Sequence, residues 1–300
     1  MTNQEQVDAV SRMQNYIHEH MHEPITLYDL SQVAGYSPWH SAKIFKQLTN
    51  KTAFEYIRDL RLSRAALVLR DQKTKVLDVA LDYVFQSHEG FTRAFSKAFG
   101  VSPKRYADNP TPIKLFIDYP VRDYYHYKKG DRNMKEKKET HTVFVQVIDR
   151  EARKLILKRG VKATHYFEYC EEVGCDIWGI LTSVKDALYE PIGVWLPPKM
   201  VPAGTSIYAQ GVEVSKDYSG KIPEGFDIID LPPCKMMVFQ GQPYEDEQFG
   251  EAIDDVEKAI QGYDPTVYGF AWAEDDGPRF QLEPRGYRGY IEAKPVREIK

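Results

Sequence analysis

The chain is poor in cysteine and has no long apolar run, and each absence narrows what the protein can be. Only three of its 300 residues are cysteine, an odd number that does not suit a framework of paired disulfides, so we expect reduced thiols. No stretch approaches about 18 consecutive apolar residues, so we expect no membrane-spanning helix. The N-terminus lacks the basic and apolar regions of a signal peptide. These absences favour a soluble protein of the cytoplasm.

Sequence signatures of catalysis and of metal binding are also missing. Cys170 and Cys175 lie close to His165, but their spacing suits zinc poorly. The chain has no Ser-His-Asp signature, no phosphate-binding loop and no dinucleotide fingerprint. We therefore expect no metal, no cofactor and no enzymatic activity.

Charge is distributed unevenly along the chain, although the net charge is only −4. Residues 1–110 hold 14 Lys and Arg against 12 Asp and Glu, and residues 111–140 hold 8 against 5. Residues 141–300 hold 18 against 27. The length favours two domains, and the asymmetry favours two different partners. The basic front suits phosphate, whereas the acidic back repels it.

Two N-terminal segments, residues 27–49 and 76–103, share the pattern of a short helix, a tight turn and a longer helix. Apolar residues recur at helical spacing on the longer helices, namely Trp39, Ile44, Phe45 and Leu48 in the first and Phe91, Ala94, Phe95 and Phe99 in the second. Ser37 and Ser87 stand where N-caps belong. A helix presented this way can enter the major groove with its N-terminal side chains at the base edges. We therefore predict two helix-turn-helix units and double-stranded DNA as the partner.

The segments around these units complete an all-α N-terminal domain. Residues 4–21 predict an opening helix, and residues 53–71 predict a long amphipathic helix between the units. That helix is a plausible rigid spacer, because two recognition helices grip successive grooves only if their separation of about 34 Å is fixed. We place the DNA-binding domain at residues 1–110 and a linker at residues 111–140.

Residues 141–300 have a different rhythm. Strand patterns occur at residues 143–160, 192–197, 206–214 and 235–242 and on both sides of Asp275-Asp276-Gly277, and helical patterns occur at residues 176–190 and 248–263. The order is β-α-β-β, given twice. This predicts an α+β domain with two helices on one face of an antiparallel sheet and a groove between the halves.

Residues 35–65 and 85–106 resemble the AraC/XylS family of bacterial transcription regulators. The resemblance implies a promoter-binding regulator associated with the nucleoid. The second turn carries Val84 where the family usually has Gly, as at Gly35. If that site needs a positive φ, a β-branched residue costs about 1 kcal/mol or more.

Residues 141–300 resemble, less strongly, the GyrI-like effector domain, a duplicated β-α-β-β fold that binds small molecules. Its place behind an AraC-type module is the Rob-type arrangement. The pocket of that family often contains a buried Glu near the last strand, and the resemblance points to Glu292. In the family the Glu commonly stands four residues before a Pro, but Glu292 stands three before Pro295.

The resemblance points to Trp39, Ala42 and Lys43 as base-facing residues of the first recognition helix. Lys43 could donate to guanine, and the Trp39 ring could pack on a thymine methyl or the sugar backbone. Lys46 follows Lys43 by one turn and could contact phosphate. Alternatively, Trp39 belongs to the core.

In the second recognition helix, Arg93 is the matching base-reading cation. His88 and Glu89 lie near the helix start, where Glu89 could accept from cytosine or merely cap the helix. Lys97 is a phosphate candidate. Further phosphate candidates, each of which could equally be an ordinary solvated charge, are Arg61, Lys104 and Arg105.

The acidic domain is rich in aromatic residues, and the candidate ligand-binding residues are Glu292, Trp272, Trp195, Tyr208, Phe270 and Tyr290. By strand parity Glu292 shares a face with Tyr290, and Trp272 shares one with Phe270 and Tyr268. Aromatic rings around a carboxylate suit a hydrophobic organic cation. The alternative is that the rings fill a core while Glu292 pairs with Arg288 or Lys294 at the surface.

Three functions for residues 141–300 remain open at this point. The first is effector binding that regulates the DNA-binding domain. The second is hydrolysis of electrophilic small molecules, with Glu292 as base and a nearby Tyr as acid. The third is contact with another protein, such as RNA polymerase.

Overall fold

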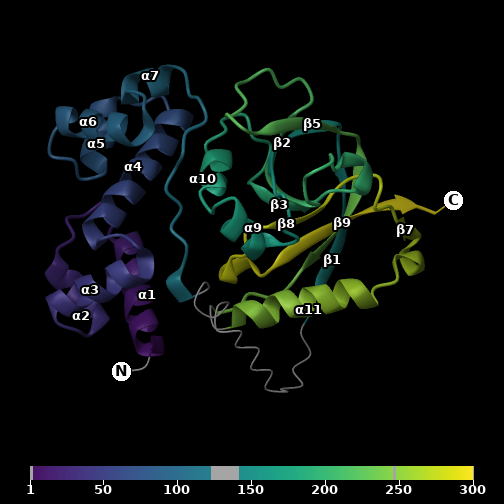
Figure 1. The fold of residues 1–300 in the computed structure, drawn as a ribbon, viewed down its shortest axis with the longest axis horizontal. Coiled ribbons are helices and arrows are strands. Elements are labelled where there is room, and N and C mark those ends of the chain that lie inside the picture. The colour runs from purple at the N-terminus through teal and green to yellow at the C-terminus, as the bar shows by residue number, and fades with distance from the viewer. Residues whose placement is uncertain (1–2, 123–141, 246–247, 300) are drawn as a thin grey trace. The chain divides into compact units, whose positions relative to one another are not determined.

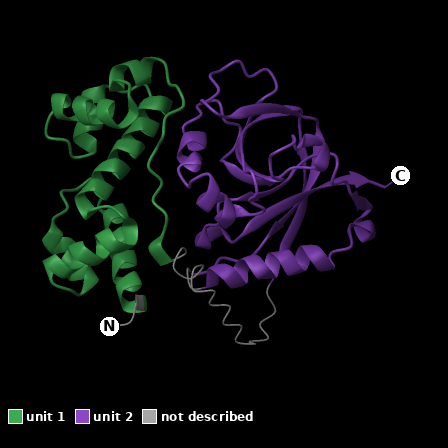
Figure 2. Ribbon diagram, in the orientation of Figure 1, with its two compact units in different colours: residues 1–131 green, residues 132–300 purple. Residues whose placement is uncertain are grey.

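The computed structural model describes residues 3–122, 142–245 and 248–299 (Figure 1). The chain divides into an N-terminal unit, residues 1–131, and a C-terminal unit, residues 132–300 (Figure 2).

Within residues 3–122, the regular structure of the N-terminal unit is entirely helical. Its helices are α1 (Asn3–Glu19), α2 (Leu27–Ala34), α3 (Pro38–Thr49), α4 (Ala53–Asp71), α5 (Val76–Asp82), α6 (His88–Phe99) and α7 (Pro103–Asp108). The pairs α2–α3 and α5–α6 are the two predicted helix-turn-helix units, and α4 lies between them (Figure 1). The prediction of an all-α domain with two such units is confirmed.

Local hydrogen bonds set where these helices begin. The side chains of Ser37 and Ser87 accept from the backbone N–H groups of His40 and Gly90, so both serines are the predicted N-caps. Thr52 forms a reciprocal capping box with Glu55 at the start of α4. The two recognition helices and the spacer helix therefore start at positions defined by the local sequence.

One continuous core ties both helix-turn-helix units together. Buried residues of this core come from every helix of the unit, among them Val10, Leu30, Phe45, Leu60, Phe91 and Tyr106. Helix α4 contacts α3 on one side and α5, α6 and α7 on the other. Phe54, near the start of α4, is exposed, because the buried face there is made by Ala53, Tyr56 and Ile57. The spacer helix is thus embedded in the core that it connects.

The first part of the predicted linker packs onto this unit. Ile113, Leu115 and Val121 are buried in the N-terminal core, and the N–H of Phe116 donates to Ser63 Oγ at 2.7 Å. Residues 123–140 of the predicted linker lie outside the described residues.

The C-terminal unit is built on one antiparallel sheet. Its strands are β1 (Phe144–Arg150), β2 (Arg153–Arg159), β3 (Ile192–Trp195), β4 (Tyr208–Ser215), β5 (Asp227–Leu231), β6 (Cys234–Gln240), β7 (Phe270–Trp272), β8 (Arg279–Leu282) and β9 (Ile291–Glu298). The helices are α9 (Tyr166–Glu172), α10 (Ile177–Thr182) and α11 (Phe249–Gly262). The strand order is β1-β6-β9-β8-β3-β4-β2-β5, with β7 added beside β9.

That strand order is symmetric about the β3–β8 pair, which confirms the predicted duplication. The first half consists of two strands, helices α9 and α10, and two strands. The second consists of two strands, helix α11 and three strands, of which β7 is the additional one. The first strand of each half pairs in the other half: β1 with β6, and β5 with β2. The prediction missed β5, which lies in a Pro- and Gly-rich stretch, and the break between β1 and β2. It also placed one helix at residues 176–190, where the structure has the shorter α10, and it did not predict α9.

The helices cover one face of the sheet. Helices α9 and α10 pack on β2 and β4 through Tyr169, Leu181 and Val212, and α11 packs on β6 and β9 through Val256 and Ile260. The opposite face forms a separate apolar cluster that includes Leu155, Val194 and Phe280. The central strands β3, β4, β8 and β9 therefore present polar residues on the helix-covered face, where the candidate ligand residues lie.

Candidate nucleic-acid interface and ligand site

The first recognition helix, α3, presents its predicted contact residues on an outward face. Trp39 is 72% exposed, and Lys43 Nζ lies 5.4 Å from the centre of its ring. Lys46 is exposed and Ala42 is partly exposed, one turn along the same face. The alternative that Trp39 belongs to the core is wrong, because Ile44 and Phe45 supply the buried side.

The second recognition helix, α6, is arranged in the same way. Phe91 and Phe95 are buried, and His88, Glu89, Arg93 and Lys97 are exposed. Glu89 does not cap the helix, since Ser87 accepts the bond from the N–H of Gly90. Both helices therefore expose side chains from their first turns onward, where base-reading residues are needed.

The exposed cations of these two helices form no ion pair with a described residue, although Lys43 Nζ lies near the Trp39 ring. Within the described ranges, no ion pair involves Lys43, Lys46, Arg93 or Lys97. Arg61, by contrast, donates to the backbone carbonyls of Met21 and Glu23 and braces the chain after α1. A cation without a carboxylate partner among the described residues can neutralise phosphate or reach a base edge.

These features define the class of the N-terminal unit: a double helix-turn-helix DNA-binding module with one shared core. The helix-turn-helix domain family matches residues 30–109. The chain is 38% identical over 107 residues to the right origin-binding protein of Escherichia coli K12. The matched segment covers 36% of this chain and 37% of that protein. It is 39% identical over 89 residues to the probable transcription factor PqrA of Proteus vulgaris, covering 30% of this chain and 73% of that one.

The chain therefore belongs to the AraC/XylS family of transcription regulators. It is also similar to the solved DNA-binding domain of AdpA in complex with a target DNA, at 20% identity and a TM-score of 0.33, covering 41% of this chain and 98% of that one. The chain spans little more than a third of the length of the right origin-binding protein that it matches.

In the C-terminal unit, Glu292 is fully buried and carries an ion pair with Arg279. Arg279 donates through Nε to Oε1 and through Nη2 to Oε2, the latter at 2.8 Å. Burial by itself lowers the pKa of Arg279, but the hydrogen bond and the charge of Glu292 outweigh it and raise the pKa above the ordinary value. The predicted alternative of a surface pair is wrong, since Arg288 pairs with Glu190 and Lys294 with Glu274.

Two of the predicted aromatic residues, Trp195 and Tyr208, adjoin this ion pair. The guanidinium carbon of Arg279 lies 4.2 Å from the centre of the Trp195 ring. Trp195 is fixed by its Nε1, which donates to the carbonyl of Thr164 at 2.8 Å, and it packs edge-on against Tyr208 at 5.1 Å. The indole face is therefore held towards the guanidinium.

Tyr290, another predicted residue, reaches the same carboxylate. Its hydroxyl donates to Gln281 Oε1 at 3.2 Å and lies 3.4 Å from Glu292 Oε2. Burial and the charge of Glu292 raise the pKa of Tyr290 well above its ordinary value. The hydroxyl therefore remains a neutral donor.

Buried polar groups without partners lie next to these residues. Tyr208 Oη and both polar atoms of the Gln210 side chain are buried and make no hydrogen bond to any described residue. Gly193 pairs with Gln210 on one side and Gln281 on the other, and a side chain at Gly193 would collide with Tyr208 Oη. The bare backbone of Gly193 thus leaves room for the polar ends of its neighbours.

Trp272 and Phe270 lie on β7, away from Glu292. Trp272 pairs with Val296 at the far end of β9, packs against Phe239 and has Lys294 Nζ at 4.7 Å from its ring. Tyr268, predicted to share their strand, lies in the 3-10 helix Pro265–Tyr268 and is exposed. The three residues do not surround the carboxylate.

Sequence reasoning missed Arg279, Gln281 and Gln210. These three residues complete the ligand cluster, which also contains Glu292, Tyr290, Trp195 and Tyr208. Parity along β8 places Arg279 and Gln281 on one face, but that parity does not show which strand is adjacent. The pairing of Gln281 with Glu292 across β8 and β9 brings them together.

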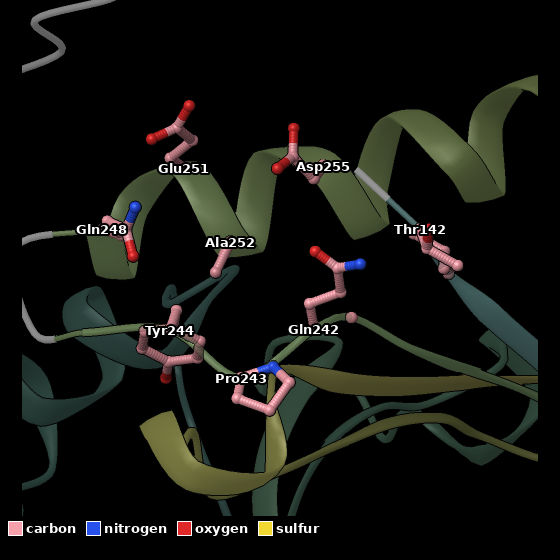
Figure 3. A pocket seen from close by; sticks show the side chains of 10 residues that line it. Thr142, Gln242, Pro243, Tyr244, Gln248, Glu251, Ala252 and Asp255 are labelled. Carbon is pink, nitrogen blue, oxygen red and sulfur yellow. The ribbon is translucent and has the colours of Figure 1, made fainter. Parts of the chain in front are cut away.

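A separate cavity of about 160 Å³ lies between α11 and the loop after β6 (Figure 3). It is lined by residues such as Gln242, Pro243, Tyr244, Glu251 and Asp255, and none of the predicted ligand residues lines it. Across the described ranges 3–122, 142–245 and 248–299, no group of three or more His, Cys, Asp or Glu could hold a metal ion. No helix in the same ranges is long and apolar enough to cross a membrane.

Proposed function

We propose that the N-terminal unit reads a promoter sequence through both recognition helices, with Trp39, Ala42, Lys43 and Arg93 at the base edges. The observation that carries this proposal is the pair of outward faces on α3 and α6, each with a cation that forms no ion pair with any described residue. We assign phosphate contacts to Lys46 and Lys97, which follow one turn later on each helix. His88 and Glu89 lie at the start of α6, where they can reach the edge of the groove.

Base reading is tested by comparing a selected high-affinity duplex with a scrambled duplex of the same length. We expect Lys43→Ala and Arg93→Ala each to weaken binding to the selected duplex by about 1–3 kcal/mol and to change binding to the scrambled duplex much less. Lys46→Ala is the control, because loss of a phosphate contact weakens both complexes alike. Equal losses on both duplexes for Arg93→Ala would overturn the base-reading assignment.

We propose further that residues 1–110 are the DNA-binding domain, residues 111–140 the linker and residues 141–300 a GyrI-like effector domain. Support comes from the buried residues around Gly193: Tyr208, whose hydroxyl has no described partner, packs against Trp195, and the Trp195 ring faces the Arg279 that pairs with Glu292. Buried polar groups without partners cost stability, so such a cluster is a candidate binding site. Both carboxylate oxygens of Glu292 are occupied by Arg279, which favours binding over catalysis by Glu292.

The effector site is tested by a thermal-shift screen of small aromatic compounds against wild type and Trp195→Ala. We expect some compounds to stabilise wild type. These compounds should bind Trp195→Ala at least tenfold more weakly than wild type. Trp272→Ala is the matched control, because Trp272 lies at the other end of β9. If the affinity of these compounds fell in Trp272→Ala and not in Trp195→Ala, the binding site would lie at β7. For regulation, the same compounds must change the affinity of the full chain for the selected duplex.

A further inference from the structure

The helix-covered face of the C-terminal sheet already contains a cation of its own. An aromatic face and a buried carboxylate are the two groups that recognise an organic cation. Here the face of Trp195 and the carboxylate of Glu292 are both engaged by the guanidinium of Arg279, at 4.2 Å from the ring centre and 2.8 Å from Oε2. Arg279 therefore lies where a bound cation would lie.

We propose that Arg279 determines the ligand selectivity of this site, so that the wild-type protein excludes permanent organic cations and takes uncharged aromatic ligands. The inference rests on the effector-binding role proposed above. A foreign cation must displace Arg279 from a carboxylate that is 0% exposed, and a buried ion pair whose partner is removed leaves a costly unpaired charge. Arg279 itself is tethered to β8, so it competes as an intramolecular ligand.

The charges around Arg279 disfavour an anion as well. Glu257 on α11 has its Oε1 at 3.9 Å from Arg279 Nη2, so two carboxylates flank one guanidinium. Burial and the charge of Glu292 both raise the pKa of Glu257. An anionic ligand would meet this excess negative charge, whereas an uncharged ligand would not.

The remaining polar groups suit an uncharged hydrogen-bonding ligand. Tyr208 Oη and the amide of Gln210 offer donors and acceptors without a described partner. The ring of Tyr208 packs against Trp195, and Gln210 follows two residues later on the same strand. A phenol or an aromatic amide can satisfy such groups while its ring packs on the aromatic residues. This is the ligand class that we assign to the site.

The test uses the full chain and three probes: tetraphenylphosphonium, tetraphenylborate of the same size and opposite charge, and uncharged 4-phenylphenol. Wild type, Arg279→Gln, Glu292→Gln and the double variant are titrated with each probe in potassium-free buffer. We expect 4-phenylphenol to bind wild type, and tetraphenylphosphonium to bind Arg279→Gln at least tenfold more tightly than wild type. The gain should disappear in the double variant, which lacks the carboxylate. Tetraphenylborate should bind none of them with comparable affinity.

Circular dichroism of each variant checks folding, and the double variant serves as a folded reference without an unpaired buried charge. Equal binding of tetraphenylphosphonium to wild type and to Arg279→Gln would contradict the role of Arg279 in selectivity. It would not contradict the proposed effector site. Absence of binding by every probe to all four proteins rejects the proposed effector site itself, and the selectivity with it.

Discussion

Gly35 and Val84 occupy equivalent positions in the two turns of the DNA-binding unit, with φ angles of 73° and 63°. The match extends to the hydrogen bonds that follow each helix. The N–H of Tyr36 donates to the carbonyl of Ser31 at 3.3 Å, and the N–H of Phe85 donates to that of Ala80 at 2.9 Å. This six-to-one bond is that of a Schellman motif, which requires the left-handed conformation at one residue. The second turn therefore imposes on a valine a backbone conformation suited to glycine.

We predict that Val84→Gly raises the stability of the N-terminal unit by up to about 1 kcal/mol, because the β-branched side chain is strained at positive φ. The gain in stability is limited because glycine has more conformational entropy than valine in the unfolded chain. Val84→Asn, which keeps a side chain and tolerates this conformation, should also stabilise. Thermal unfolding followed by helical circular dichroism measures both variants.

Gly35→Val is the converse control and should destabilise the unit by about 1–2 kcal/mol. An added Cβ at Gly35 meets nothing within 4 Å, so a loss there reports backbone strain and not a clash. If Val84→Gly lowered the melting temperature as much as Gly35→Val, backbone strain at Val84 would be excluded.

A second prediction concerns the buried ion cluster at the turn between β1 and β2. Arg153 Nε lies 2.6 Å from Glu213 Oε1, and Arg150 Nη1 lies 3.3 Å from Oε2, with all three side chains at least nine-tenths buried. Glu213→Gln leaves two buried guanidinium groups without a counter-charge, so we expect a loss of about 3–5 kcal/mol in unfolding free energy. Urea denaturation followed by tryptophan fluorescence measures it.

The control for this cluster is Asp149→Asn, which removes an exposed partner of Lys235 on the same strand as Arg150. Exposed pairs contribute little, so its urea midpoint should match that of wild type. If the urea midpoint of Glu213→Gln also matched that of wild type, the two guanidinium groups would not depend on the carboxylate and would be stabilised by solvation.

The elements that could be predicted from the sequence are those whose signal is local. Helix α4 was predicted at residues 53–71 and is found at Ala53–Asp71, because a long apolar repeat and a Thr52 cap define it. Strand β5 and helix α9 were missed, since each spans at most seven residues. The position of Glu292 near the last strand was predictable by resemblance. Its partner Arg279 was not, because that contact depends on which strands pair across 13 residues of sequence.

A third prediction addresses the floor of the ligand cluster. Gly193→Ala places a methyl group against Tyr208 Oη and 3.1 Å from Gln281 Cγ in a closely packed region, so we expect a loss of about 1–3 kcal/mol. Tyr208→Phe alone should be nearly neutral, because it removes a buried hydroxyl that has no described partner. The double variant should lose less than Gly193→Ala alone. Additive losses in this double-mutant cycle would rule out a clash with the hydroxyl.

A fourth prediction concerns alkaline pH. Burial raises the pKa of Tyr106 from 10.0 to about 12, with a smaller opposing contribution from Arg70. The folded state therefore holds this proton more tightly than the unfolded state does. The resulting contribution to the free energy of unfolding is fully present below pH 10 and is lost as the pH rises towards about 12. Two pKa units correspond to about 2.7 kcal/mol at most.

Tyr106→Phe should remove this dependence on pH and change the stability little at neutral pH, because Tyr106 Oη is buried and makes no hydrogen bond to a described residue. The variant should consequently lose less stability than wild type between pH 10 and pH 12 in urea titrations. Tyr56→Phe is the contrasting control, since Tyr56 Oη accepts a hydrogen bond from Gln14 Nε2 at 3.0 Å and its removal costs stability at neutral pH. Identical alkaline slopes for wild type and Tyr106→Phe would mean that Tyr106 ionises only after the unit has unfolded for another reason.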